Sequence, residues 1–125
     1  MNELGMNQLT EQVIGAAIAV HRAIGPGFLE ATYAKALAVE FRHLGISFVQ
    51  EAPVLMNYRG ESIGEGRLDF LVQGRLILEL KAVDQLHPIH TAQAISYLKA
   101  TGHKLVLLIN FNVPVLKDGI KRIAH

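Results

Sequence analysis

Three charged residues interrupt two apolar segments in the middle of the chain, and this pattern limits the folds that the chain can adopt. The segments, residues 68–72 and 76–83, lie on either side of Gly74, and such short runs are typical of a β-hairpin. Asp69, Glu79 and Lys81 fall inside these predicted strands. A buried ionised group is costly unless it is paired or binds a metal. We therefore expect the fold to use these three side chains.

The register of this hairpin decides whether the three charges meet. Glu79 and Lys81 share a face because side chains alternate along a strand. Asp69 joins them only if the loop has an odd number of residues centred on Gly74, which places Asp69 and Glu79 opposite, roughly 5 Å apart at Cβ. Two carboxylates so placed repel unless a divalent cation lies between them. Oxygen ligands favour Mg²⁺ or Mn²⁺, with the Leu80 carbonyl as a further ligand.

The Glu-x-Lys triplet also fits a simpler interpretation. Short motifs match by accident, and Glu79 and Lys81 alone are typical of a solvated stripe on an edge strand. An even-numbered loop would place Asp69 on the opposite face and exclude the metal site. The presence of Asp69 and the apolar flanks favour the functional interpretation.

Length and composition predict a single domain over residues 1–125, with half of the residues hydrophobic. The net charge of +1 gives no strong global field for nucleic acid, although a local basic cluster remains compatible with it. The chain has no cysteine, which excludes disulfides and thiolate metal sites and fits a reducing compartment. The first residues lack a basic segment before an apolar stretch, and no run approaches the length of a membrane span. We expect a cytoplasmic protein without membrane contact.

Helical spacing predicts two helices in the first part of the chain, over residues 10–24 and 28–44, separated by the turn residues 25–27. The apolar face of the first comprises Val13, Ile14, Ala17, Ile18, His21 and Ile24. The face of the second comprises Tyr33, Leu37, Phe41 and Leu44. This second face projects back onto Glu30. A glutamate in a first turn also favours the helix dipole as a plain surface residue, but its alignment with the buried face favours a functional role.

The remaining elements complete an α/β order. Strands are predicted at residues 46–50 and 54–58, followed by a turn at 59–61 and the acidic hairpin. A third helix is predicted over residues 88–101, with Pro88 in its first turn and Gly102 after its end. Residues 104–111 form a continuous apolar run typical of a strand covered on both faces, and the tail adds a short edge strand. This order predicts a mixed β-sheet flanked by helices.

Polar residues of the third helix give two further candidate sites. Gln93 and Tyr97 share a helix face, where they fit either the border of a core or groups that orient a metal-bound water or a phosphate. His87 and His90 match the spacing of a histidine metal site. Because no third ligand has a suitable spacing nearby, exposed or capping histidines explain this pair better.

Taken together, these residues resemble a known group of proteins. The series Asp69, Glu79-Leu-Lys81 and Gln93-Ala-Ile-Ser-Tyr97 resembles the PD-(D/E)XK nuclease superfamily, particularly its RecB-like branch, although Leu68 stands where the superfamily name has proline. More closely, Gly27-Phe-Leu-Glu-Ala-Thr-Tyr33 is similar to the signature of the small bacterial and archaeal GxxExxY proteins. The similarity continues through residues 21–27, 79–83, 97–102, 108–111 and 117–122, and so covers nearly the whole chain.

The resemblance implies a restriction-endonuclease-like core and a role for each matching position. By position, the catalytic residues are Lys81, Glu79, Asp69 and Glu30, and the auxiliary helix pair is Gln93 and Tyr97. The three acids correspond to metal ligands, and the lysine corresponds to the residue that positions or activates the attacking water. This agrees with the chemistry of phosphodiester hydrolysis, which needs a cation and benefits from an adjacent ammonium.

The expected function is therefore a nuclease dependent on Mg²⁺ or Mn²⁺, acting on nucleic acid, with DNA favoured over RNA. Substrate contacts are expected from Arg67, Lys99 and Arg22, with Arg59 and Lys104 as further candidates. A domain this small offers little surface for a long duplex, so a homodimer is expected to help. The alternative is a non-catalytic nucleic-acid-binding or regulatory module that retains the nuclease fold. Retention of Asp69, Glu79 and Lys81 argues against this alternative.

Overall fold

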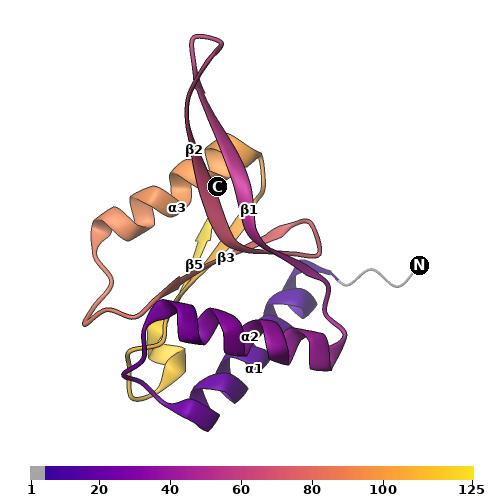
Figure 1. The fold of residues 1–125 in the computed structure, drawn as a ribbon, viewed down its shortest axis with the longest axis vertical. Helices are drawn as coiled ribbons and strands as arrows, with labels where there is room; N and C mark the ends of the chain where they lie inside the picture. Colours follow the sequence, from indigo (N-terminus) through magenta and orange to yellow (C-terminus); the bar gives the residue numbers. More distant parts are fainter. Residues whose placement is uncertain (1–4) are drawn as a thin grey trace.

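The chain forms a five-stranded mixed β-sheet that is covered by helices on both faces. The computed structural model describes residues 5–125. Residues 1–4, where the sequence predicts no targeting segment, lie outside the described residues. In chain order (Figure 1), the elements are α1 (Met6–Ile24), α2 (Glu30–Leu44), β1 (Phe48–Tyr58), β2 (Glu61–Val72), β3 (Leu76–Lys81), α3 (Pro88–Thr101), β4 (Leu105–Asn110), the 3-10 helix η1 (Leu116–Gly119) and β5 (Ile120–Ala124). The strands lie in sequence order; β3 and β4 are parallel, and the other neighbours are antiparallel. The predicted fold class is confirmed.

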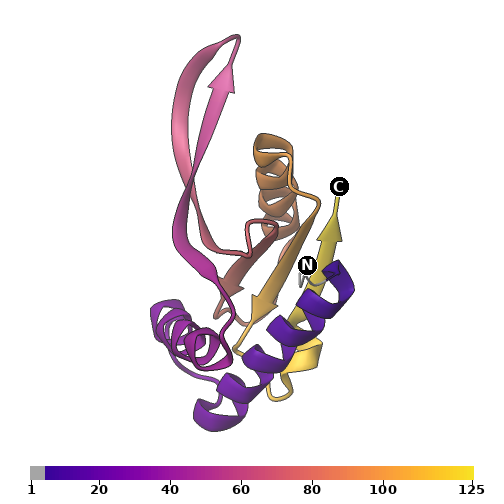
Figure 2. The ribbon, with the colours of Figure 1, turned by 90° about the vertical axis from the view of Figure 1, so that its right-hand side faces the viewer.

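Helices α1 and α2 pack together on one face of the sheet (Figures 1 and 2). The buried side of α1 comprises Leu9, Thr10, Val13, Ala16, Ala17, Val20 and His21, whereas Ile14, Ile18 and Ile24 are only partly buried. The buried face of α1 is thus rotated from the predicted one, toward Leu9, Ala16 and Val20. Leu44, predicted to be buried in α2, is 50% exposed. Within residues 5–125, no helix is long and apolar enough to cross a membrane.

Helix α3 covers the opposite face and has the bounds that the sequence predicts. Pro88 stands in its first turn, and the His87 backbone N–H donates a hydrogen bond of 3.0 Å to His90 Nδ1. Gly102 ends the helix in the left-handed conformation, with φ of 77°. Helix capping therefore accounts for the two histidines that match a metal-site spacing.

Strands β1 and β2 bend where they leave the main sheet. Strict alternation would place Leu68 and Phe70 on one face, yet Phe70 packs with α1 and α2 while Leu68 packs on the side of α3. Residues 48 and 52 of β1 differ in the same way. At the bend, Glu51 has φ of 54°, which interrupts the ladder between the pairs 50–70 and 52–68. The two strands predicted at 46–50 and 54–58 are therefore one bent strand.

Beyond this bend, the β1–β2 hairpin projects from the body of the molecule, as both ribbon views show (Figures 1 and 2). Its turn consists of Arg59 and Gly60, both with positive φ, at 50° and 82°. Such a pair gives a type I′ turn, whose twist matches that of an antiparallel hairpin. Leu55, Tyr58 and Ile63 are exposed on the projecting part.

The connection from η1 to β5 depends on one glycine, which gives a first testable prediction. A Cβ atom at Gly119 would lie against the backbone carbonyl oxygen of Asn110, which cannot move without disturbing β4. We expect Gly119→Ala to lower the free energy of unfolding by roughly 3 kcal/mol, measured by urea denaturation. Gly15→Ala is the control, because open space surrounds its Cβ position and alanine favours a helix. Equal stability of the two variants would contradict the close contact.

Candidate active site

The acidic hairpin has the register that brings its charges together. Strand β2 pairs with β3 through Phe70–Leu78, Leu71–Ile77 and Val72–Leu76, which leaves a three-residue loop centred on Gly74. The loop is thus odd-numbered, and the next positions along the two strands are Asp69 and Glu79. At this point the backbone ladder stops, and a gap opens between β2 and β3.

The two carboxylates fill this gap by bonding to the opposite strand. The Asp69 backbone N–H donates a hydrogen bond of 2.9 Å to Glu79 Oε2, and the Leu80 backbone N–H donates one of 2.7 Å to Asp69 Oδ2. Each carboxylate therefore replaces a rung of the ladder. Among the described residues, the second oxygen of each carboxylate accepts no hydrogen bond. Both acids are thus held in place while one oxygen of each stays available.

Strand β3 adds two groups to the same gap. Lys81 shares a face with Glu79 by alternation, and its charge favours the ionised forms of Asp69 and Glu79. Its side chain forms no hydrogen bond or ion pair within the part of the chain that the structure describes. The Leu80 carbonyl points to the same side of the strand as the Leu80 N–H, which bonds to Asp69. The gap therefore presents an ammonium and a carbonyl oxygen beside the carboxylates.

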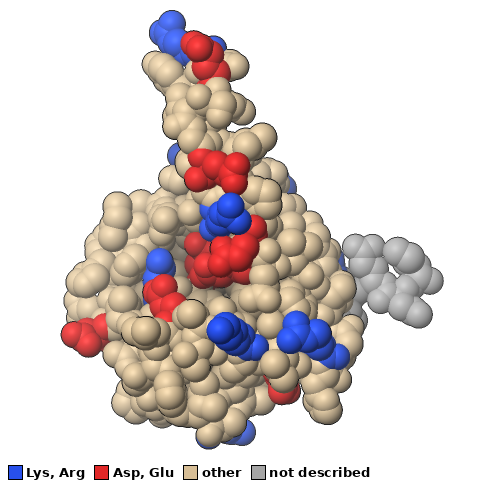
Figure 3. All heavy atoms as spheres, in the orientation of Figure 1, with Lys and Arg blue, Asp and Glu red and all other residues tan. Residues whose placement is uncertain are grey.

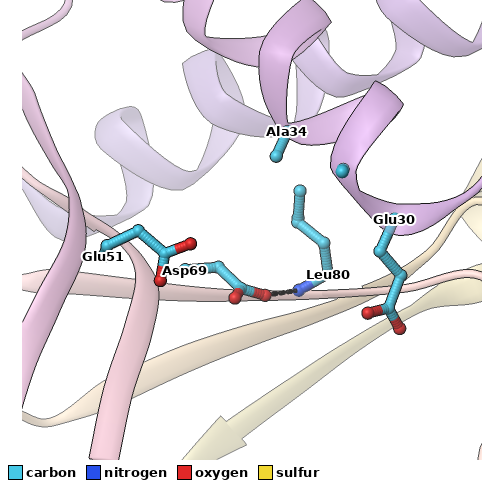
Figure 4. A pocket seen from close by; sticks show the side chains of 6 residues that line it. Glu30, Ala34, Glu51, Asp69 and Leu80 are labelled. Carbon is cyan, nitrogen blue, oxygen red and sulfur yellow. Dashed lines mark hydrogen bonds between the residues drawn. The ribbon is translucent and has the colours of Figure 1, made fainter.

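A cavity of about 210 Å³ opens from this gap toward α2. It is lined by Glu30, Glu51 and Asp69, together with Ala31, Ala34 and Leu80. Acidic side chains gather in a hollow on this face of the molecule, with basic atoms beside them (Figure 3). Figure 4 shows Glu51 and Asp69 close together on one side of the cavity and Glu30 on the other, beyond Leu80. In residues 5–125, no three histidine, aspartate or glutamate side chains converge closely enough to hold a metal ion.

Glu30 owes its position to Tyr33, one turn further along α2. The N-cap residue of α2, Leu29, offers no side-chain cap. Instead, the Tyr33 hydroxyl donates a hydrogen bond of 2.6 Å to the Gly25 carbonyl and accepts one of 3.3 Å from the Phe28 N–H. The fully buried Tyr33 ring stacks on Phe111 at 4.4 Å between centroids. This anchor fixes the loop that precedes α2 and thereby the start of the helix.

On the other face of the gap, α3 contributes Gln93 and Tyr97. Tyr97 packs directly over Gly66 of β2, where an added Cβ atom would lie 2.9 Å from Tyr97 Cε1. Gln93 Nε2 donates a hydrogen bond of 3.4 Å to the Tyr97 hydroxyl. The Tyr97 pKa is raised by burial and by the nearby charges of Glu79 and Asp69. The hydroxyl therefore stays protonated and able to donate beside the acids.

The electrostatics of the gap disfavour two ionised carboxylates. Burial raises the pKa of Glu79 to about 8, and the charge of Asp69 adds to this effect. Burial also raises the pKa of Asp69, while the Leu80 N–H and the Lys81 charge oppose the shift. The charge of Glu30 raises both pKa values further. A site with these properties gains most from a bound cation.

The basic residues predicted to contact substrate lie in different places. Arg67 is exposed on β2, two residues before Asp69, with Glu65 at 3.8 Å. Lys99 lines a groove between α3 and the projecting hairpin, together with Leu55 and Met56. Arg22 lies in the last turn of α1 and lines a separate cavity with His21 and Lys117. The structure therefore does not bring Lys99 and Arg22 into the acidic cavity.

Sequence patterns missed two residues that shape the site. Glu51 falls between the two strands predicted for β1, and its only signal is a charge beside apolar runs. Asn110 is 2% exposed at the end of β4, opposite Lys81. Its amide bonds to both the N–H and the carbonyl of Val83, which fixes the chain just after Lys81. The sequence signal that could have identified Asn110 is its position as a polar residue at the end of a fully apolar strand.

Comparison with known protein families relates the chain to a superfamily of nucleases. A family model described as the PD-(D/E)XK nuclease superfamily matches residues 7–123. No curated protein and no solved structure matches the chain. The family match extends from the first turn of α1 into β5 and includes all the residues of the acidic gap. With its mixed sheet and flanking helices, the chain belongs to the PD-(D/E)XK nuclease superfamily.

Proposed function

We propose that this protein is a nuclease that uses a divalent cation, Mg²⁺ or Mn²⁺, to hydrolyse phosphodiester bonds. The observation that carries this proposal is the fixed pair of carboxylates, Asp69 and Glu79, in a gap that also contains Lys81. The proposal extends to DNA as the preferred substrate and to a cytoplasmic homodimer. It also includes membership of the GxxExxY group, whose signature spans Gly27 to Tyr33.

The residues of the gap fit a hard divalent cation. Asp69 and Glu79 each keep one carboxylate oxygen free of hydrogen bonds to described residues, and the Leu80 carbonyl faces the same space. Oxygen donors of this kind are the ligands of Mg²⁺ and Mn²⁺. Glu30 lines the cavity but does not converge with the other two acids, so its part as a third ligand stays a prediction. When bound, the cation supplies charge neutralisation and lowers the pKa of water.

The side chains around the gap have complementary tasks in hydrolysis. The Lys81 ammonium orients the attacking water and stabilises negative charge on the phosphoryl oxygens. The Tyr97 hydroxyl, held protonated by burial and by neighbouring charges, donates a hydrogen bond toward the phosphate. Gln93 orients this hydroxyl through the hydrogen bond between their side chains.

The test is cleavage of labelled single-stranded, duplex and branched DNA and RNA with Mg²⁺, Mn²⁺ or EDTA. We expect cleavage that depends on the cation and is lost in Lys81→Ala, while thermal melting shows a folded protein. Lys117→Ala is the matched control, because Lys117 is exposed and lines a different cavity. Binding of Mn²⁺, followed by electron paramagnetic resonance, should persist in Lys81→Ala and weaken in Asp69→Asn.

Two outcomes would contradict the proposal. Cleavage of equal rate in the wild type and in Lys81→Ala would indicate a contaminating nuclease. Nucleic-acid binding without any cleavage, in a protein that binds Mn²⁺, would instead identify a non-catalytic binding module.

Gly66 provides an independent test of the part played by Tyr97. In Gly66→Ala the added methyl group displaces the Tyr97 ring, which is a side chain and can move, so the fold should persist. We expect the cleavage rate to fall about 100-fold, as for the loss of one positioned hydrogen-bond donor. Tyr97→Phe should lower the rate by a similar factor, and the double variant should be no slower than either single variant. Additive losses would show that Gly66 acts by another route.

A further inference from the structure

Two large apolar side chains stand exposed immediately before Glu30. Phe28 is 47% exposed and Leu29 is 80% exposed. Two residues of chain span at most about 7 Å, so the backbone of Phe28 lies within this distance of that of Glu30, which lines the cavity. Exposed apolar groups that adjoin a polar cavity are candidates for contact with a ligand.

The loop that carries Phe28 is held in a fixed conformation. The Tyr33 hydroxyl bonds to both the Phe28 N–H and the Gly25 carbonyl, and Gly27 turns the chain with φ of 104°. The Phe28 ring meets the buried Tyr33 ring edge-to-face, at 6.1 Å between centroids and 80° between planes. One side of the Phe28 ring is thus anchored while the residue stays accessible. An aromatic group presented in this way loses little entropy when it binds.

The chemistry of the neighbouring site indicates what this ring contacts. If the acidic gap receives a phosphodiester through a cation, the next group along the same strand is a nucleoside. The patch of Phe28 and Leu29 carries no charge, which suits the flat face of a nucleobase better than a phosphate. A base within a duplex has both faces covered by its neighbours, whereas an unpaired base offers one to an aromatic ring.

We propose that Phe28, with Leu29 next to it in the chain, forms a subsite that stacks one unpaired nucleobase next to the scissile phosphate. The subsite rests on the proposed nuclease function and deepens it, because it selects single-stranded segments or frayed ends over continuous duplex.

The chain has no tryptophan, so Phe28→Trp introduces a single fluorescent reporter at the subsite. We would combine it with Lys81→Ala to prevent cleavage and titrate it with single-stranded DNA, with the matching duplex, and with strands that carry one abasic nucleotide. We expect strong quenching by the single strand, at least about fivefold less by the duplex, and loss of quenching for one abasic position. Val39→Trp, also with Lys81→Ala, is the control, since Val39 is 59% exposed on α2 and outside the loop.

Cleavage gives the second measurement. Phe28→Ala should lower kcat/KM on single strands about tenfold, and Phe28→Tyr should restore it, since stacking of one base has this magnitude. If the wild type cleaves nucleic acid but Phe28→Ala cleaves equally well and the introduced tryptophan is not quenched, the subsite is wrong and the nuclease function stands. If the wild type neither binds nor cleaves any nucleic acid, both proposals fail.

Discussion

Replacement of Glu79 by glutamine is expected to abolish cleavage. In the absence of a cation, it is also expected to raise the free energy of unfolding at pH 8. Glutamine keeps an oxygen that accepts the Asp69 N–H, so the gap retains its shape. It removes the negative charge that a cation needs. Because the cation contributes several kcal/mol to the transition state, we expect the cleavage rate to fall at least about 1,000-fold.

Glu65→Gln is the matched control, because Glu65 lies on β2 four residues before Asp69 and is exposed. It should leave the cleavage rate within about twofold of the wild type. Rates are measured as initial velocities at saturating Mg²⁺ on the substrate found by the panel. An active Glu79→Gln variant would exclude Glu79 as a required ligand.

The stability of the cation-free protein should fall as the pH rises from about 5 to 8. Glu79 ionises near its ordinary pKa of 4.5 in the unfolded chain but near a pKa of about 8 in the folded protein. Between these values the unfolded state binds fewer protons, so rising pH favours unfolding. Burial also raises the pKa of Asp69, which contributes in the same direction. We expect a total loss of roughly 2–4 kcal/mol in the free energy of unfolding.

Urea denaturation in EDTA at several pH values measures this loss directly. Glu79→Gln should remove most of the pH dependence, and at pH 8 it should be more stable than the wild type. Saturating Mg²⁺ should restore the stability of the wild type at pH 8 and leave the variant nearly unchanged. A wild type whose stability is constant from pH 5 to pH 8 would show that the two carboxylates do not destabilise the cation-free fold.

The strands of the hairpin at the centre of the site could be predicted because the apolar runs around Gly74 are local signals. Its register could not, since a loop of odd or even length fits the same runs, and only the structure gives the three-residue loop that sets Asp69 opposite Glu79. The bounds of α3 could also be predicted, since Pro88 and Gly102 mark both of its ends. Tyr97 lies near the acids, as the resemblance implies, because α3 packs on the face of the sheet that carries Glu79.

Features that depend on packing between distant elements escaped prediction. The buried face of α1 is set by packing against α2, β3 and η1, and η1 lies almost a hundred residues away along the chain. The bend at Glu51 depends on a backbone conformation with positive φ, which no pattern of side chains at this position indicates. The hydrogen bonds of Tyr33 were hidden for another reason, since its helical spacing is also that of a plain core residue.

The hydrogen bonds across the gap have a consequence for how such a protein evolves. Asp69 and Glu79 complete the pairing of β2 with β3, so a descendant that lost activity would still need an acceptor at both positions. Lys81 makes no comparable contribution to the pairing of the strands, because its side chain bonds to no described residue. Inactive descendants should therefore keep acids or amides in the gap and lose the lysine first. In related sequences, the lysine is the better marker of retained activity.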